Sequence, residues 1–193
     1  MNFSASEFKN ENFKELDFSG QKLVDKEFEN CTFYKCIFNG TNLSQTVFVD
    51  CQFEKCEFSL SGLVGTVLNN VKFIACKISG LDFRKLNSRI LKVYFEKSLL
   101  QFCELSEIDL SKTLFSTCDI KESNFYNTNL TGANFTDSDL DQTIFENCIL
   151  KKTDFSRALN CIINPANNKF KKTKFSRASA LNILKYFDIE IID

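Results

Sequence analysis

Apolar residues recur at every fifth position over most of the chain. Positions 3, 8, 13 and onward to 83 are all Phe, Leu or Ile, and a second block with the same rhythm runs from Ile90 to Phe155. Two positions before each of them, from Cys31 to Thr153, the residue is almost always Cys, Ser, Thr, Ala or Val. A period of five fits neither an α-helix, near 3.6, nor a flat strand, at 2. The pattern indicates an internal repeat with a five-residue unit.

The units resemble those of the pentapeptide repeat family. The segments TNLTG at 128–132 and ANFTD at 133–137 carry a small residue, then Asn, then Leu or Phe, then two further residues that are mostly polar. This resemblance implies an all-β fold, a right-handed quadrilateral parallel β-helix with four units per coil. One large and one small inward residue in each five can fill such a narrow tube. About eight coils, spaced by about 4.8 Å, would give a rod whose stability comes from neighbouring coils.

A coil of 20 residues places residues 20 apart in one column. Phe33, Phe53 and Phe73 then stack, but the rhythm shifts by two residues between Phe83 and Ile90. At a step of 22 the column continues through Phe95, Phe115, Phe135 and Phe155. We therefore predict one continuous core with an outward bulge at Leu86-Asn87. A neutral insertion at a corner is the simplest role for that bulge.

Both ends depart from the repeat. The small slot of the first units holds Glu11, Gln21 and Lys26, and charged side chains cannot lie unpaired in a dry tube. Within a β-helix spanning 1–159, we expect residues 1–30 to be irregular or to form a capping coil. The rhythm fails at Asn160, and Asn164-Pro165 indicates a turn out of the rod.

Residues 160–193 are therefore expected to form a capping or dimerisation segment with a helix at about 177–187. Such a small apolar segment must cover the last coil, pair with a second copy, or do both; a lid on a monomer is the simpler alternative. Two-fold dimers are the commonest oligomers. The residues expected at a dimer interface are Leu181, Ile183, Leu184, Phe187, Ile189 and Ile191.

Composition argues against an enzyme. The chain has no His, no phosphate-cradling glycine loop and no Cys pair at zinc-binding spacing, so we expect no catalytic residue, no metal and no cofactor. Eight of the nine Cys lie in the small slot, where stacked pairs would come within disulfide range. We favour buried free thiols.

The start of the chain has no signal-peptide pattern and no apolar run has membrane-spanning length, so a cytoplasmic protein that contacts no membrane is expected.

The order of repeats, Asn-Pro turn, short apolar helix and Ile-rich end is similar to one subgroup of the family. It contains the quinolone-resistance proteins and the immunity protein against a gyrase-poisoning microcin. The resemblance implies a homodimer, joined through its C-terminal helix, that resembles DNA in size and charge. It also implies binding to DNA gyrase, and often topoisomerase IV, with relief of poisoning. The alternative is a protein–protein interaction scaffold with an unknown partner.

Charge limits the mimicry to one region. Duplex DNA carries one negative charge per about 1.7 Å, whereas this chain has 25 acidic and 24 basic residues. Column stacking places Asp119, Asp139 and Asp141 on one face, with Glu122 and Asp137 at its edges, and solubility is the alternative role of these charges. The basic cluster from Lys169 to Arg177 could touch DNA or solubilise the tail. Because no basic stripe with aromatic residues runs along the rod, we expect no direct nucleic-acid binding.

Overall fold

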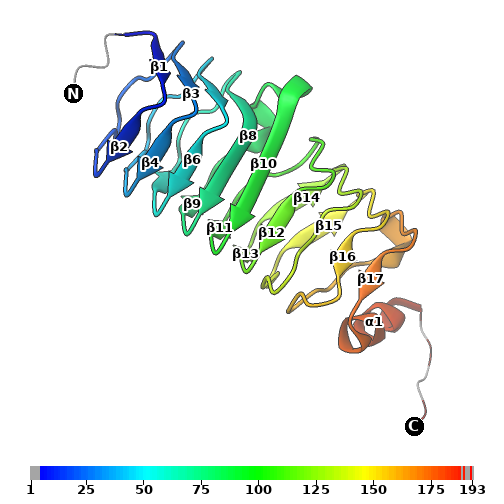
Figure 1. The fold of residues 1–193 in the computed structure, drawn as a ribbon. Helices are drawn as coiled ribbons and strands as arrows, with labels where there is room; N and C mark the ends of the chain where they lie inside the picture. The colour runs from blue at the N-terminus through cyan, green and yellow to red at the C-terminus, as the bar shows by residue number, and fades with distance from the viewer. Residues whose placement is uncertain (1–4, 188, 190–191, 193) are drawn as a thin grey trace.

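In the computed structural model the chain winds into a right-handed, four-sided parallel β-helix whose coils stack in one direction from the N-terminus to a short C-terminal helix (Figure 1). The structure describes residues 5–187, 189 and 192. Phe3, the first residue of the five-residue rhythm, and Ile191, one of the expected interface residues, lie outside this part. In the described part, no helix has the length and apolar character needed to cross a bilayer.

The strands are short because each unit turns a corner after three extended residues. They are β1 Glu7–Lys9, β2 Asn12–Lys14, β3 Glu27–Glu29, β4 Thr32–Tyr34, β5 Val47–Val49, β6 Gln52–Glu54, β7 Glu57–Ser59, β8 Val67–Ile74, β9 Lys77–Ser79, β10 Leu91–Glu96, β11 Leu99–Gln101, β12 Leu114–Ser116, β13 Asp119–Lys121, β14 Asn124–Tyr126, β15 Ile144–Glu146, β16 Asp154–Phe155 and β17 Lys174–Phe175. The helical elements are the 3₁₀ turns η1 Phe83–Lys85, η2 Ser88–Ile90, η3 Pro165–Asn167 and η4 Lys185–Phe187, and the α-helix α1 Arg177–Leu184.

The strands pair in parallel with strands of the neighbouring coils. Phe33 in β4 lies opposite Phe13 in β2 and Phe53 in β6, which is a step of 20 residues in both directions. The strands β7, β9, β11 and β13 form the next side of the rod in the same way. This 20-residue register is why side chains of one type form columns along the rod.

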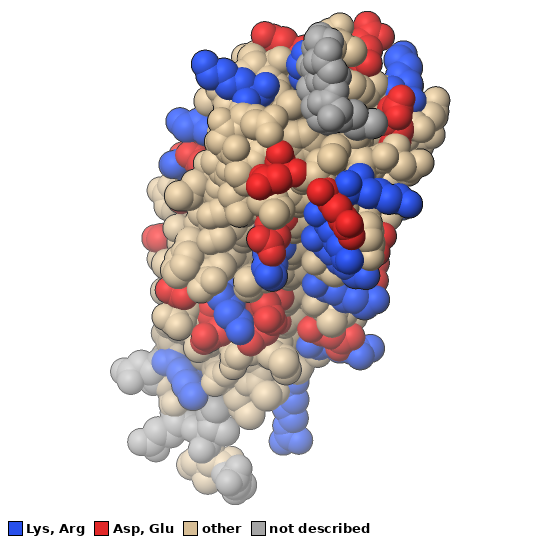
Figure 2. All heavy atoms as spheres, turned by 90° about the vertical axis from the view of Figure 1, so that its left-hand side faces the viewer, with Lys and Arg blue, Asp and Glu red and all other residues tan. Residues whose placement is uncertain are grey.

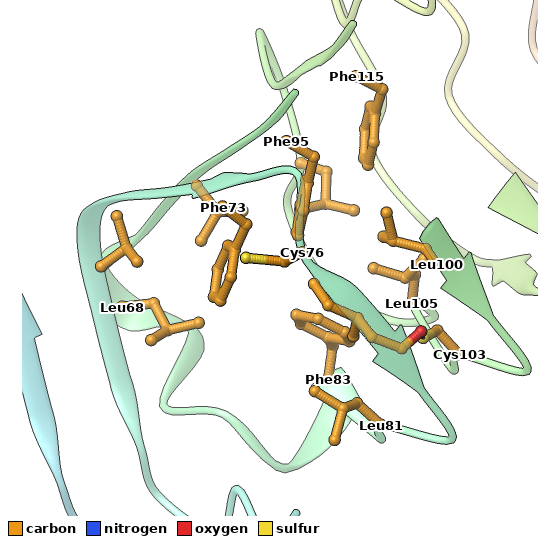
Figure 3. Close-up of a cluster of buried hydrophobic side chains, with 14 of the residues drawn as sticks. Leu68, Phe73, Cys76, Leu81, Phe83, Phe95, Leu100, Cys103, Leu105 and Phe115 are labelled. Carbon is orange, nitrogen blue, oxygen red and sulfur yellow. The ribbon is translucent and has the colours of Figure 1, made fainter. Parts of the chain in front are cut away.

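The inward Phe residues stack face to face through the bulge. Ring centroids lie 4.7 Å apart for Phe33–Phe53 and 5.2 Å apart for Phe73–Phe95, so the 22-residue step preserves the column. The column extends one coil beyond Phe155 to Phe175, at 5.5 Å. Figure 3 shows part of it, packed against neighbouring Leu and Cys side chains. Burying one such ring stabilises the fold by about 1.5–3 kcal/mol.

The small slot has its own chemistry. The Thr41 hydroxyl donates to the Phe18 carbonyl at 2.8 Å, 23 residues earlier, and the Cys51 thiol makes the same contact with the Phe28 carbonyl at 3.3 Å. A buried hydroxyl without a partner would cost about 1–3 kcal/mol, and this geometry satisfies it. Thr, Ser and Cys can therefore replace one another in the slot because each is small and can donate to the coil before.

The bulge lies later than predicted. Leu86 is buried in the small slot, and the exposed residues are 87–90, so the expectation of an outward Leu86 is wrong. Leu91 pairs with Leu68 at a step of 23, and the register returns to 22 between Lys92 and Val93. Relative to the 20-residue coil, the chain therefore has three extra residues before β10. Within β10 it then has one residue fewer than the paired strand β8. Counting apolar positions detects only the net shift of two.

The expected irregularity of residues 1–30 is also wrong for the part that is described. Phe8 lies opposite Phe28 in regular β1–β3 pairing, and Phe13 is buried. At the free end of the rod Glu11 is exposed and Lys26 is half-buried, and the Lys26 ammonium donates to the Ala5 carbonyl. The first coil keeps its backbone geometry because these side chains are not enclosed by another coil.

At the other end, the β-helix continues past the predicted boundary at residue 159. Strand β17 pairs with β16, and Thr173 donates to the Leu150 carbonyl as other small-slot residues do. Cys161 and Ile163 are buried across the irregular segment between these strands. The helical segment begins where expected, with α1 capped by the Ser176 hydroxyl and continued by η4.

Candidate partner-binding surfaces

The predicted acidic residues lie together on adjacent coils near the C-terminal end. Asp119 on β13 is bridged in parallel to Asp139, and the Glu122 amide donates to the Asp141 carbonyl. Asp137 precedes this side of the rod at a left-handed corner. The 20-residue step therefore brings together residues up to 22 positions apart, and we call these five residues the acidic patch.

Two cations lie within the acidic patch. The Lys121 ammonium is 3.8 Å from carboxylate oxygens of both Asp119 and Asp139, and the Arg157 guanidinium is 2.8 Å from Asp137. Five carboxylates less two cations leave three negative charges. Lys121 belongs to the same three-residue strand as Asp119, so a search for acidic residues alone missed it. Figure 2 likewise shows acidic and basic side chains intermingled over the visible face.

A groove of about 510 Å³ runs from the acidic patch to the C-terminal segment. Asp141 and Gln142 line one end, and Ile162, Asn164 and Tyr186 line the other. Ile162 is 59% exposed and Tyr186 is 47% exposed. The groove thus joins negative charge to exposed apolar side chains.

The fold buries one of the predicted dimer residues and leaves the other described ones exposed. Ile183 is buried, whereas Leu181, Leu184, Phe187 and Ile189 each keep more than a third of their surface exposed. Sequence reasoning missed Leu159, Ile162 and Tyr186, which are exposed in the same C-terminal region. Leu159 and Ile162 flank Asn160, where the repeat rhythm broke and the pattern of inward residues no longer indicated which side chains face out.

Helix α1 covers the last coil incompletely. A hollow of about 360 Å³ remains between Phe170 and Phe175 on one side and Ile183 and Leu184 on the other. Phe170 and Phe175 are only partly buried although they pack against the core. The end of the hydrophobic column therefore keeps apolar surface that a further molecule could bury.

The thiols are protected by the core. All nine Cys are buried and free, and burial raises the pKa of Cys51 and of Cys118 to about 12. The thiolate is the reactive form, so these thiols are poor nucleophiles and poor metal ligands at neutral pH. Among the described residues, no group of three or more His, Cys, Asp or Glu could hold a metal ion.

Two family models match the sequence. The pentapeptide repeat region matches residues 26–101, and the SV2A/B/C luminal domain matches residues 66–145. No curated protein matches the chain.

Solved structures extend the likeness to nearly the whole chain. Two trypsin-treated variants of QnrB1, a plasmid-mediated fluoroquinolone resistance protein, are similar to it with TM-scores of 0.61 and 0.59. They are 18% and 17% identical, cover 97% of this chain in each case, and are themselves covered over 98% and 92% of their length. At this identity the likeness concerns the fold. The repeat pattern, the pentapeptide repeat match over residues 26–101 and the coil geometry agree on the fold, a pentapeptide repeat β-helix.

Proposed function

We propose that this protein is a non-enzymatic homodimer that binds DNA gyrase and topoisomerase IV and protects them against a poison such as a quinolone or a peptide toxin. The observation that carries the proposal is the fold likeness to QnrB1, which spans the coils and the C-terminal region together. QnrB1 is a fluoroquinolone resistance protein, and a rod of similar form could occupy the same kind of binding surface.

The acidic patch supports a limited form of DNA mimicry. A topoisomerase surface that binds duplex DNA is basic, and the patch offers carboxylates on two successive coils next to an apolar groove. Because the rest of the rod carries mixed charge, we assign the mimicry to these coils alone. The free thiols fit a reducing compartment, and we place the protein in the cytoplasm with its target.

The test is a gyrase supercoiling and cleavage assay with purified protein, with and without quinolone. We expect the wild-type protein to reduce quinolone-stabilised cleavage in a concentration-dependent way. The double variant Asp139→Asn/Asp141→Asn should need about 30-fold more protein for the same effect, since two charged contacts of about 1 kcal/mol each are lost. Both substitutions keep the carbonyl oxygen that accepts local hydrogen bonds.

The matched control is Asp25→Asn/Glu107→Gln, which removes two exposed carboxylates outside the patch. It should protect as the wild-type protein does. If the wild-type protein neither inhibits nor protects gyrase or topoisomerase IV over a wide concentration range, the proposal is wrong. A pull-down that then returned a different protein would favour the interaction scaffold.

A further inference from the structure

Charged residues 20 positions apart are paired with opposite charges along most of the rod. Five cross-coil salt bridges follow this rule, with N···O distances of 2.8 to 3.3 Å: Lys9–Glu29, Glu15–Lys35, Glu57–Lys77, Asp137–Arg157 and Asp154–Lys174. The step of 20 places each pair on neighbouring coils, about 4.8 Å apart. Opposite charges at this spacing are stabilising and like charges are destabilising.

One basic region breaks the rule with two adjacent pairs. Lys151 lies one coil before Lys171, and Lys152 lies one coil before Lys172, as the Lys152 amide bonded to the Lys171 carbonyl shows. All four side chains are exposed, and none forms a salt bridge with an acid in the described part of the chain. The stacked acids Asp119 and Asp139 have a counter-ion in Lys121, whereas Glu7 and Glu27, stacked at the open end of the rod, form no salt bridge in the described part of the chain.

The lysines follow a corner of the rod. Lys112, Gly132, Lys152 and Lys172 occupy the same left-handed corner position in four successive coils, and the Lys112 stem lies 3.7 Å from where a side chain at Gly132 would begin. Lys169 adds a further exposed charge on the last coil. We call Lys112, Lys151, Lys152, Lys169, Lys171 and Lys172 the lysine edge. Lys112 lies just before β12, and the other five lysines lie on the coils that carry β16 and β17 (Figure 1).

We propose that the lysine edge binds the phosphate backbone of duplex DNA. A line of like charges kept without internal counter-ions is complementary to a linear polyanion. Lys171 and Lys172 border the open hollow under α1, but the edge as a whole follows successive coils, which fits an extended anion better than a small one. The aromatic rings beside Lys171 and Lys172 are those of Phe170 and Phe175, which are partly buried against the core in the hollow under α1, so we assign the edge to a phosphate backbone and not to stacked single-stranded bases. Lysines act as point charges on flexible stems, which suits contact with phosphates without reading sequence.

This inference revises the expectation that the chain contacts no nucleic acid. In the sequence, the basic residues near the end are interrupted by other residues and Lys112 lies some 40 positions earlier. The 20-residue coil brings them into one edge. The inference does not rest on the proposed gyrase binding, because it concerns other residues and DNA alone.

The test is fluorescence anisotropy with a labelled 20-base-pair duplex at several salt concentrations, in the absence of any topoisomerase. We expect wild-type binding at low salt that weakens steeply as salt rises and differs little between sequences. The variant Lys151→Gln/Lys152→Gln/Lys171→Gln/Lys172→Gln should bind at least about tenfold more weakly. Its slope of log affinity against log salt should be shallower by about 3–4, at about 0.9 per phosphate contact.

The matched control is Lys14→Gln/Lys22→Gln/Lys72→Gln/Lys85→Gln, which removes the same charge from lysines elsewhere that form no salt bridge in the described structure. It should bind as the wild-type protein does. The single variant Lys171→Glu tests the same edge through thermal stability as well as DNA binding. It creates an opposite-charge pair with Lys151, so the melting temperature should rise while DNA binding falls.

Several results would overturn the inference. They are the absence of DNA binding at 50 mM salt, equal loss in the edge and control variants, and a lysine-edge-dependent preference for phosphatidylserine vesicles or polyglutamate over DNA. The last result would assign the same edge to an anionic membrane or an acidic protein.

Discussion

At the scale of single residues, the two inward positions in each unit stabilise the coil in different ways. The large position fills the tube, and the ring of Phe73 contacts those of Phe53, Phe58 and Phe95 at centroid distances of 5.2 to 5.6 Å. The small position supplies a hydroxyl or thiol that bonds to the previous coil. Stability therefore depends on close packing in one slot and on hydrogen bonding in the other.

Phe73→Ala should destabilise the protein by about 3–5 kcal/mol, because it leaves a cavity in a column that cannot collapse around it. Urea denaturation followed by circular dichroism measures the change in the free energy of unfolding. The control is Phe102→Ala, since Phe102 is 55% exposed, and it should cost less than about 1 kcal/mol. Equal losses in the two variants would contradict the account of the core.

At the scale of elements, the last strand pair decides how the rod ends. Strand β17 is only two residues long, and the Lys174 ammonium bonds to the Asp154 carboxylate at 2.8 Å across the pair. Burial alone would raise the pKa of Asp154, but hydrogen bonds from Lys174 and Ser156 outweigh it and hold the pKa below its ordinary value. A carboxyl with a lowered pKa stabilises the fold above its unfolded pKa of about 3.9.

The contribution of Asp154 should therefore be present at neutral pH and disappear as the pH falls below about 4 through its folded pKa. At pH 7, Asp154→Asn should speed amide hydrogen exchange in β17 and the start of α1, and its difference from the wild-type protein should shrink as the pH falls below about 4. Asp137→Asn removes a similar pair with Arg157 that does not hold the last strand. Its effect should stay outside β17, and faster exchange there would argue against this role of Asp154.

The element boundaries show what the sequence pattern could predict. The two out-of-phase blocks correctly indicated one stacked column, because the step of 22 keeps Phe73 opposite Phe95. The end of the rod was placed too early because the rhythm was followed only until its first failure at Asn160. Phe170 and Phe175, at 15 and 20 positions after Phe155, are back in phase and could have indicated the last coil. No five-residue count predicts the irregular path between them.

At the scale of the whole molecule, the two ends of the rod differ. The first coil ends in exposed charged side chains, whereas the last coil ends in a partly covered apolar column. Exposed charges discourage association at an open edge, and exposed apolar surface favours it. We therefore expect a dimer to form through the C-terminal end.

Leu184→Asp should convert the dimer into a monomer, because it places a charge beside the hollow formed with Phe170 and Phe175. Multi-angle light scattering at several protein concentrations measures the mass directly. Leu60→Asp serves as the control, since Leu60 is 74% exposed on a corner remote in sequence from the C-terminal segment. A wild-type protein that is monomeric at all concentrations would refute the tail-to-tail dimer.

The sequence by itself determined the repeat, the core columns and the chemistry of the small slot, because these depend on a local spacing that the chain repeats in every coil. The same spacing predicted that Asp119, Asp139 and Asp141 share a face, but only the tertiary structure decided which cations lie among them. The coil brings Lys121 and Arg157 among the acidic residues and aligns Lys151 with Lys171, because contact across coils depends on the local step, which is 20 residues in most of the rod and 22 or 23 beside the bulge. The charged side chains that lie next to each other on this protein are therefore those of neighbouring coils, and not those close together in the sequence.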